Sequence, residues 1–172
     1  SELLTDIVGN QKGYYACDPE YVNFYVHIPF CPSRCKYCSF VSVAIDKQKK
    51  FVLPYVSALK SEIISAVSLL EKSGKKVFSV YIGGGTPTVL DERSLDEILS
   101  VIPYRNVEYT CEAGRPETIT KDKLEILSRR GVSRISINPQ TLFDETLVNI
   151  GRNHTAADFF NAYSLARRFD FD

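Results

Sequence analysis

The feature that most constrains the fold is a regular alternation between short strand-like segments and amphipathic helical segments. The stretch YVNFYVHI (residues 21–28) alternates apolar and polar residues, as a half-buried strand does. Apolar residues at helical spacing follow over residues 51–73 and end at Gly74. Further strands are expected at 77–82, 107–113 and 133–138, with helices at 90–102, 120–131 (with Thr120 as the N-cap), 143–151 and 155–168.

This order of about four βα units predicts an α/β fold with a parallel sheet and right-handed crossovers. Four units correspond either to an open sheet or to the first part of a barrel, and in both cases ligands bind at the carboxyl ends of the strands. Distinctive residues follow every expected strand: Cys31, Cys35 and Cys38; Gly83, Gly84, Gly85, Thr86 and Pro87; Cys111, Glu112 and Arg115; Asn138, Pro139 and Gln140.

The cysteines after the first strand have the spacing C-x3-C-x2-C in FCPSRCKYC. Three thiolates on one loop suit an iron–sulfur cluster that keeps one iron open to an outside ligand, much as catalytic zinc sites keep an open position. A zinc site with His27 as the fourth ligand is the alternative, although zinc motifs usually pair two short ligand hairpins. A disulfide is less favoured in a reducing compartment, and Cys17 and Cys111 are interpreted as ordinary free thiols.

Each of the other residues at the strand ends, taken alone, also fits an ordinary structural role without ligand binding. GGGTPT is neither a P-loop nor a G-x-G-x-x-G motif, and by itself fits a tight turn as well as a ligand-binding turn. Glu112 alone fits a surface ion pair, Gln140 a loop cap, and His154 a solvated loop histidine. Their joint position at one sheet edge is what favours a binding site.

Composition excludes some classes of partner. The 172 residues carry 21 basic and 21 acidic side chains, so the neutral net charge gives no support to binding nucleic acid. No apolar run is expected to span a membrane, and the N-terminus lacks the pattern of a signal peptide. We therefore expect a soluble, cytoplasmic protein with reduced cysteines.

The motifs YVHIPFCPSRCKYC, YIGGGTPT, CEAGRPETI and GVSRISINPQT…TLVNIGRNHT together resemble the radical S-adenosylmethionine (SAM) enzymes. They resemble most the family of oxygen-independent coproporphyrinogen III dehydrogenases (oxidases). The resemblance implies a partial (β/α)6-type barrel, of which residues 21–172 form the first part after an extension over residues 1–20. It further implies that this core continues beyond residue 172.

The resemblance also implies roles for single residues. Cys31, Cys35 and Cys38 would hold a [4Fe–4S] cluster, and SAM would chelate the fourth iron. The implied contacts of SAM are Tyr25, Tyr37 at the adenine, the backbone of Gly83, Gly84, Gly85 and Thr86 at the methionine portion, and the polar groups of Glu112, Gln140 and Arg152.

The implied reaction begins when the reduced cluster cleaves SAM to methionine and a 5′-deoxyadenosyl radical. The radical would start the oxidative decarboxylation of coproporphyrinogen III propionates to vinyl groups, with flavodoxin or ferredoxin as the reductant. A further cysteine follows the cluster motif in the dehydrogenases, whereas Ser39 and Phe40 follow Cys38 here. This departure leaves open a haem-binding or haem-chaperone function in the same family, and a zinc-stabilised module without catalysis is the third alternative.

Overall fold

The fold is a parallel α/β domain built on one four-stranded sheet. The computed structural model describes residues 4–6, 9, 18–40 and 42–172, so Cys17 and most of the expected extension lie outside the described residues. The strands pair in the order β1-β4-β5-β6, all parallel. Their bounds are β1 Tyr21–Ile28, β4 Lys76–Gly84, β5 Glu108–Glu112 and β6 Arg134–Ser136. The predicted parallel sheet is thereby confirmed.

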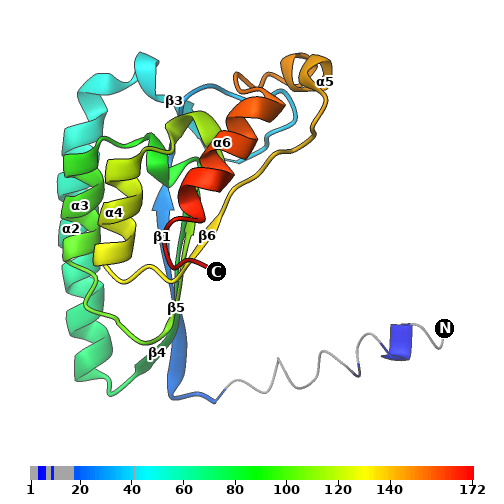
Figure 1. Cartoon of the computed structure of the whole chain (residues 1–172). Coiled ribbons are helices and arrows are strands. Elements are labelled where there is room, and N and C mark those ends of the chain that lie inside the picture. The colour runs from blue at the N-terminus through cyan, green and yellow to red at the C-terminus, as the bar shows by residue number, and fades with distance from the viewer. Residues whose placement is uncertain (1–3, 7–8, 10–17, 41) are drawn as a thin grey trace.

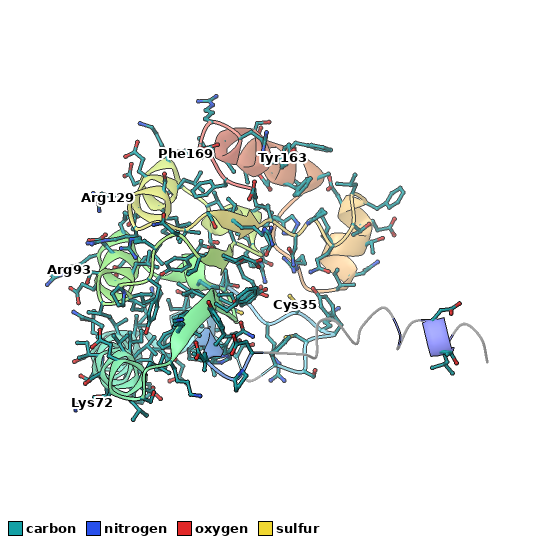
Figure 2. The ribbon with its side chains drawn as sticks, turned by 90° about the horizontal axis from the view of Figure 1, so that it is seen from below. Cys35, Lys72, Arg93, Arg129, Tyr163 and Phe169 are labelled. Carbon is teal, nitrogen blue, oxygen red and sulfur yellow. The ribbon has the colours of Figure 1, made fainter. Side chains whose placement is uncertain are left out.

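Helices connect consecutive strands, as βα units require. The α-helices are α2 Lys49–Lys72, α3 Glu92–Ser100, α4 Lys121–Arg129, α5 Asp144–Asn149 and α6 Ala156–Ala166. Short 3-10 turns are η1 Ile45–Lys47, η2 Pro87–Val89 and η3 Pro116–Thr118. In Figure 1, α2, α3 and α4 stand together along one side of the sheet. Figure 2 shows that α6 continues this row into an arc, with Cys35 on its inner side.

The helix ends follow the expected local chemistry. Thr120 caps α4 by accepting a hydrogen bond from the backbone N–H of Lys123, as predicted. Thr155 and Asp158 form a capping box at the start of α6. Gly74 and Gly131, just beyond α2 and α4, have positive φ angles of 67° and 87°, which only glycine adopts without strain.

The two faces of the sheet differ in chemistry. Toward the helices, the strands present fully buried side chains, among them Val26, Ile28, Val80, Ile82, Tyr109 and Cys111. Toward the inside of the arc, polar side chains face one another across the strands. The Ser79 hydroxyl donates to Asn23 Oδ1 at 2.8 Å, and the Tyr25 and Tyr81 rings stack with centroids 6.1 Å apart. The core therefore lies between the sheet and the helices, and the opposite face of the sheet is available for polar ligands.

A small second sheet is an element that the sequence patterns do not predict. β2 (Phe30–Cys31) and β3 (Val43–Ala44) pair in parallel, with two residues each. They bracket the loop that carries Cys35 and Cys38, and the N–H of Val43 donates to Pro29 O at 2.8 Å. The cysteine loop is thus closed at its base.

Helix α2 corrects the expectation that no segment is long and apolar enough to span a membrane. Its 24 residues include a window of mean hydropathy 1.3, so by length and composition it passes that test. It is also the crossover between the directly paired strands β1 and β4, and it buries Val52, Val56, Leu59 and Ile63 in the core. These contacts favour its role as a core helix of the α/β domain.

The carboxyl ends of the strands meet at one edge of the sheet. In Figure 1 the strands run upward, and the cysteine loop and α5 lie at the top. At the β6 edge, the N–H of Asp172 donates to Ser133 O at 2.9 Å and Asp172 O accepts from the N–H of Ile135 at 3.3 Å. These bonds place the last residue parallel to β6, as in the next strand of a barrel. The structure matches the partial radical SAM barrel that the sequence predicts.

Candidate functional site

Segments remote in the sequence hold the cysteine loop in place. The backbone N–H of Lys36 donates to Ile150 O at 2.9 Å, and the Ser33 hydroxyl donates to Gly151 O at 3.4 Å. A Cβ added at Gly151, where φ is 78°, would lie 3.3 Å from Arg34 O. Glycine therefore lets the chain after α5 run directly against the loop.

All three thiols of the loop line one cavity of about 170 Å³ at the carboxyl end of the sheet. Each of these cysteines is half-buried. Most of the residues predicted to bind SAM line the same cavity: Tyr37, Gly84, Gly85, Thr86, Glu112, Gln140 and Arg152. The cavity also has lining residues outside that predicted set: Phe40, Gly114, Arg115 and Asn138. Arg115 and Asn138 follow strand ends, and this position is the sequence signal that was available for them.

The glycine turn after β4 is shaped by its closeness to the cysteine loop. The N–H of Gly85 donates to Ile28 O at 2.7 Å, and that of Thr86 donates to Phe30 O at 2.8 Å. A Cβ at Gly85 would lie 2.6 Å from Phe30 O and 3.0 Å from Cys31 Sγ, so no side chain fits there. The Thr86 hydroxyl donates to Cys31 Sγ at 3.5 Å. The turn thus supports the first cysteine as well as lining the cavity.

Tyr37 and Arg152 meet across the cavity. Arg152 Nη2 donates to the Tyr37 hydroxyl at 3.1 Å, and Arg152 Nη1 donates to Gly114 O at 2.7 Å. Arg152 is buried, whereas Tyr37 is 52% exposed. Burial raises the pKa of Tyr37 despite the neighbouring arginine, so the phenol stays protonated at neutral pH.

Tyr25 and Gly83 do not line this cavity. Tyr25 is connected to the cavity residue Glu112 through Tyr81, and Gly83 lies next to the carboxylate of Glu112. Tyr25 stacks on Tyr81, whose hydroxyl donates to Glu112 Oε1 at 2.6 Å. A Cβ on Gly83 would lie 3.1 Å from Glu112 Oε2. Burial and the hydrogen bond to Glu112 raise the pKa of Tyr81, which keeps it a donor. The carboxylate is thereby oriented with one oxygen bound to Tyr81.

Gln140 enters the cavity from the loop after β6 with an unusual backbone. Its φ of 62° lies in the left-handed region, which is sparsely populated by residues other than glycine. Such conformations cost about 1–3 kcal/mol and cluster at binding sites. The position fits a functional side chain better than a loop cap.

The donor set fits an iron–sulfur cluster better than a single zinc ion. Within the described ranges, no three His, Cys, Asp or Glu side chains converge closely enough to bind one metal ion. Cysteines that each bind a different iron need not converge on one point, and all three cysteines line one cavity. His27, the fourth ligand of the zinc alternative, lines a different cavity with Tyr55 and Glu62. Arg115 Nη1 also donates to Cys35 Sγ at 3.5 Å, as suits an anionic cluster.

Comparison with known proteins agrees with this fold and donor set. The family model of the radical SAM superfamily matches residues 25–172, and the chain belongs to this superfamily. Enzymes of the superfamily use a [4Fe–4S] cluster and SAM, as the resemblance implies.

Three proteins of this superfamily show which of its members the chain is similar to. The oxygen-independent coproporphyrinogen-III oxidase-like protein HemZ of Bacillus subtilis is 40% identical over 86% of this chain and 30% of that protein. The heme chaperone HemW of B. subtilis is 35% identical over 86% of the chain and 39% of the relative. The structure of coproporphyrinogen III oxidase (HemN) from Escherichia coli, a radical SAM enzyme, superposes with a TM-score of 0.74 and 28% identity, covering 85% of this chain and 34% of that one. The chain thus spans about a third of these relatives, and the predicted resemblance to coproporphyrinogen oxidase-like proteins is confirmed.

Proposed function

We propose that the protein is a radical SAM enzyme of tetrapyrrole metabolism, with residues 21–172 as the first part of its catalytic core and residues 1–20 as an extension. The observation that carries the proposal is the single cavity lined by Cys31, Cys35 and Cys38 together with the glycine turn, Tyr37, Glu112, Gln140 and Arg152. When bound, a reduced cluster and SAM supply a 5′-deoxyadenosyl radical that removes a hydrogen atom from the substrate.

The chain's own residues have distinct tasks in this proposal. Cys31, Cys35 and Cys38 bind the cluster, and the backbone of Gly84, Gly85 and Thr86 receives the methionine portion of SAM. Tyr37 contacts the adenine. Glu112 accepts from ribose hydroxyls, because Tyr81 occupies only one of its two oxygens. Gln140 and Arg152 complete the polar wall, and Tyr25 supports Glu112 through its stacking on Tyr81.

For the substrate, we favour oxidative decarboxylation of coproporphyrinogen III propionates to vinyl groups. The names of HemZ and HemN support this choice. The electron would come from a protein such as flavodoxin or ferredoxin, in the cytoplasm. The second candidate is a haem chaperone, which is favoured by the similarity to HemW; it is left open by Ser39 and Phe40, which stand where the dehydrogenases carry a further cysteine.

The test begins with anaerobic reconstitution of the protein with iron and sulfide. We expect about one [4Fe–4S] cluster per chain, and release of 5′-deoxyadenosine from SAM under dithionite. Cys35→Ala should lose both the cluster and the release of 5′-deoxyadenosine. Cys111→Ala is the matched control and should keep both, because Cys111 is fully buried and faces the helices. A protein that binds one zinc and no iron would support the zinc-stabilised module instead.

The substrate is then decided by two parallel measurements. The reconstituted protein is given coproporphyrinogen III with SAM, and products are followed by mass; separately, it is titrated with haem and the Soret band is recorded. Vinyl products support the dehydrogenase. Stoichiometric haem binding without conversion of coproporphyrinogen supports the chaperone.

A further inference from the structure

Beneath the cysteine loop, the buried side chains of Arg115 and His154 lie on either side of the more exposed Glu117. The side chains of Arg115, Glu117 and His154 are 3%, 24% and 0% exposed. Arg115 follows β5, Glu117 lies in η3, and His154 precedes α6. Burying a charge is costly unless it is paired and fully hydrogen-bonded, so this arginine requires an explanation.

Every N–H of the Arg115 guanidinium has an acceptor. Nε and Nη2 donate to Glu117 Oε1 at 2.9 and 2.6 Å. Nη2 also donates to Ser33 Oγ at 2.9 Å, and Nη1 donates to Ser33 O at 3.3 Å and to Cys35 Sγ at 3.5 Å. Since a guanidinium has five N–H donors, none is left over. Three of the five bonds reach the cysteine loop, some 80 residues earlier in the chain.

Glu117 both balances and orients this arginine. Its Oε1 accepts two bonds from the guanidinium, and its Oε2 lies 3.5 Å from His154 Nδ1, a contact without the geometry of a hydrogen bond. His154 Nε2 lies 3.3 Å from Pro139 O. Glu117 therefore holds the guanidinium at Nε and Nη2, and the N–H groups of Nη1 and Nη2 point toward Ser33 and Cys35.

We propose that Arg115 is a positioning residue that fastens the cysteine loop to the end of β5 and raises the reduction potential of a cluster held there. Hydrogen bonds to the sulfurs and nearby charge are among the factors that set such potentials. A positive group donating to Cys35 Sγ favours the reduced, more negative state. The part of this inference that concerns the potential rests on the proposed function; the fastening of the loop does not.

Lysine cannot replace Arg115 fully. Its ammonium supplies the charge, but it has no planar fork that reaches Glu117, Ser33 and Cys35 together. The pair of variants Arg115→Lys and Arg115→Met therefore separates charge from geometry. Because Arg115→Met leaves the carboxylate of Glu117 without its partner, the double variant Arg115→Met/Glu117→Gln is the version that removes both charges together.

The test compares these variants with Arg130→Gln as the matched control. Arg130 makes a similar two-pronged ion pair with Asp96, at 2.7 Å for both bonds, on the helical side of the sheet. Three quantities are measured: the midpoint potential of the reconstituted cluster by EPR-monitored titration, the half-life of the cluster under an iron chelator, and hydrogen exchange of the loop amides in protein without a cluster.

We expect the midpoint potential to fall most in Arg115→Met, and to fall less in Arg115→Lys and in the double variant, which also loses the negative charge of Glu117. Cluster half-life should shorten roughly 10–100-fold, the usual effect of losing a residue that supports a metal ligand. Exchange at residues 33–37 should rise about tenfold, as expected for the loss of a hydrogen bond to a charged group. Arg130→Gln should leave all three unchanged.

Two results would overturn the inference in different ways. An unchanged potential in Arg115→Met removes the electrostatic role, and unchanged loop exchange in the double variant removes the fastening role. If the unmodified protein takes up no cluster, the proposed function fails instead, and the exchange measurement still decides whether Arg115 fastens the loop.

Discussion

The hydroxyl of Tyr37, which lies between the second and third cysteines, accepts a hydrogen bond from Arg152, 115 residues further along the chain, at 3.1 Å. The same guanidinium donates to Gly114 O beyond β5. One arginine thus connects the cysteine loop, the end of the sheet and the segment after α5 around a single cavity.

We expect Tyr37→Phe and Arg152→Gln to weaken SAM binding to different degrees. The phenylalanine keeps the ring and loses one hydrogen bond, so affinity should fall about fivefold, corresponding to ~1 kcal/mol. Arg152→Gln also leaves Gly114 O without its donor and should cost tenfold or more, about 1.5–3 kcal/mol for bonds to a charged group. Calorimetric titration of the cluster-loaded protein with SAM measures both. Tyr21→Phe, at the far end of β1, is the control, and equal affinities in all variants would contradict the proposed site.

Gly85 and Gly114 make a matched pair for testing the glycine turn. A methyl group at Gly85 would lie 2.6 Å from Phe30 O, whereas the nearest atom to one at Gly114 is Asn138 Nδ2 at 3.8 Å. We therefore expect Gly85→Ala to lower the free energy of unfolding by about 1–3 kcal/mol, the usual cost of overpacking, and to reduce iron uptake. Gly114→Ala should leave the free energy of unfolding within about 0.5 kcal/mol of the original. Urea unfolding measures the free energy of unfolding of both variants. Similar decreases in the two would show that the contact at Gly85 is unimportant.

Lys123 is a buried lysine that fastens two strand-end turns together. Its ammonium donates to Thr88 O in η2 at 2.8 Å and to Thr118 O in η3 at 3.3 Å. Lys123→Met retains the aliphatic stem but leaves these carbonyls unpaired, at an expected cost of about 1–3 kcal/mol in urea unfolding. Lys121→Met, in an exposed pair with Glu125 on the same helix, should cost less than about 1 kcal/mol. A Lys123 variant as stable as its Lys121 counterpart would refute the role.

The contact between α3 and α4 should make stability sensitive to acid. Hydrogen bonds from Arg130, and to a lesser extent Arg129, lower the pKa of Asp96 from 3.8 to about 2. Because the folded-state pKa is the lower one, this stabilisation is complete above pH 3.8 and is lost as the pH falls toward 2. For a partly exposed carboxylate we expect about 1 kcal/mol.

Asp96→Asn tests this expectation directly. Its free energy of unfolding should lie below that of the unmodified protein at pH 6, and the difference should shrink between pH 4 and pH 2. A difference that stays constant over this range would show that the ion pairs do not depend on the charge of Asp96.

The parallel sheet was predictable because each strand and helix is indicated by the pattern of residues within its own segment. Buried residues such as Val26, Val80 and Leu95 recur at the period of their own element, and Thr120 and Gly131 mark helix ends by their own chemistry. Topology then predicts that the ends of the strands meet at one edge, where Glu112, Gln140 and the glycine turn line one cavity; the positions of Tyr37 and Arg152 came from the resemblance.

The supporting contacts were not predictable, since they depend on residues brought together only by folding. Nothing near Arg115 in the sequence indicates that its partners are Ser33 and Cys35. The pairing of β2 with β3 involves two residues on each side, too few for a periodic pattern. The burial of His154, first interpreted as a solvated loop histidine when taken alone, likewise arises from the packing of η3 against α6.

The fastening of the cysteine loop by Arg115, Ile150 and Arg152 has a consequence for the order of events during synthesis. The ribosome adds about 5–20 residues per second, so roughly 6–23 s pass between the appearance of Tyr37 and that of Arg152. During this interval the cysteine loop has been synthesised, whereas the residues that anchor it have not. In the proposed function, a loop that needs these contacts to hold its cluster is expected to receive it only after the segment beyond α5 has been synthesised.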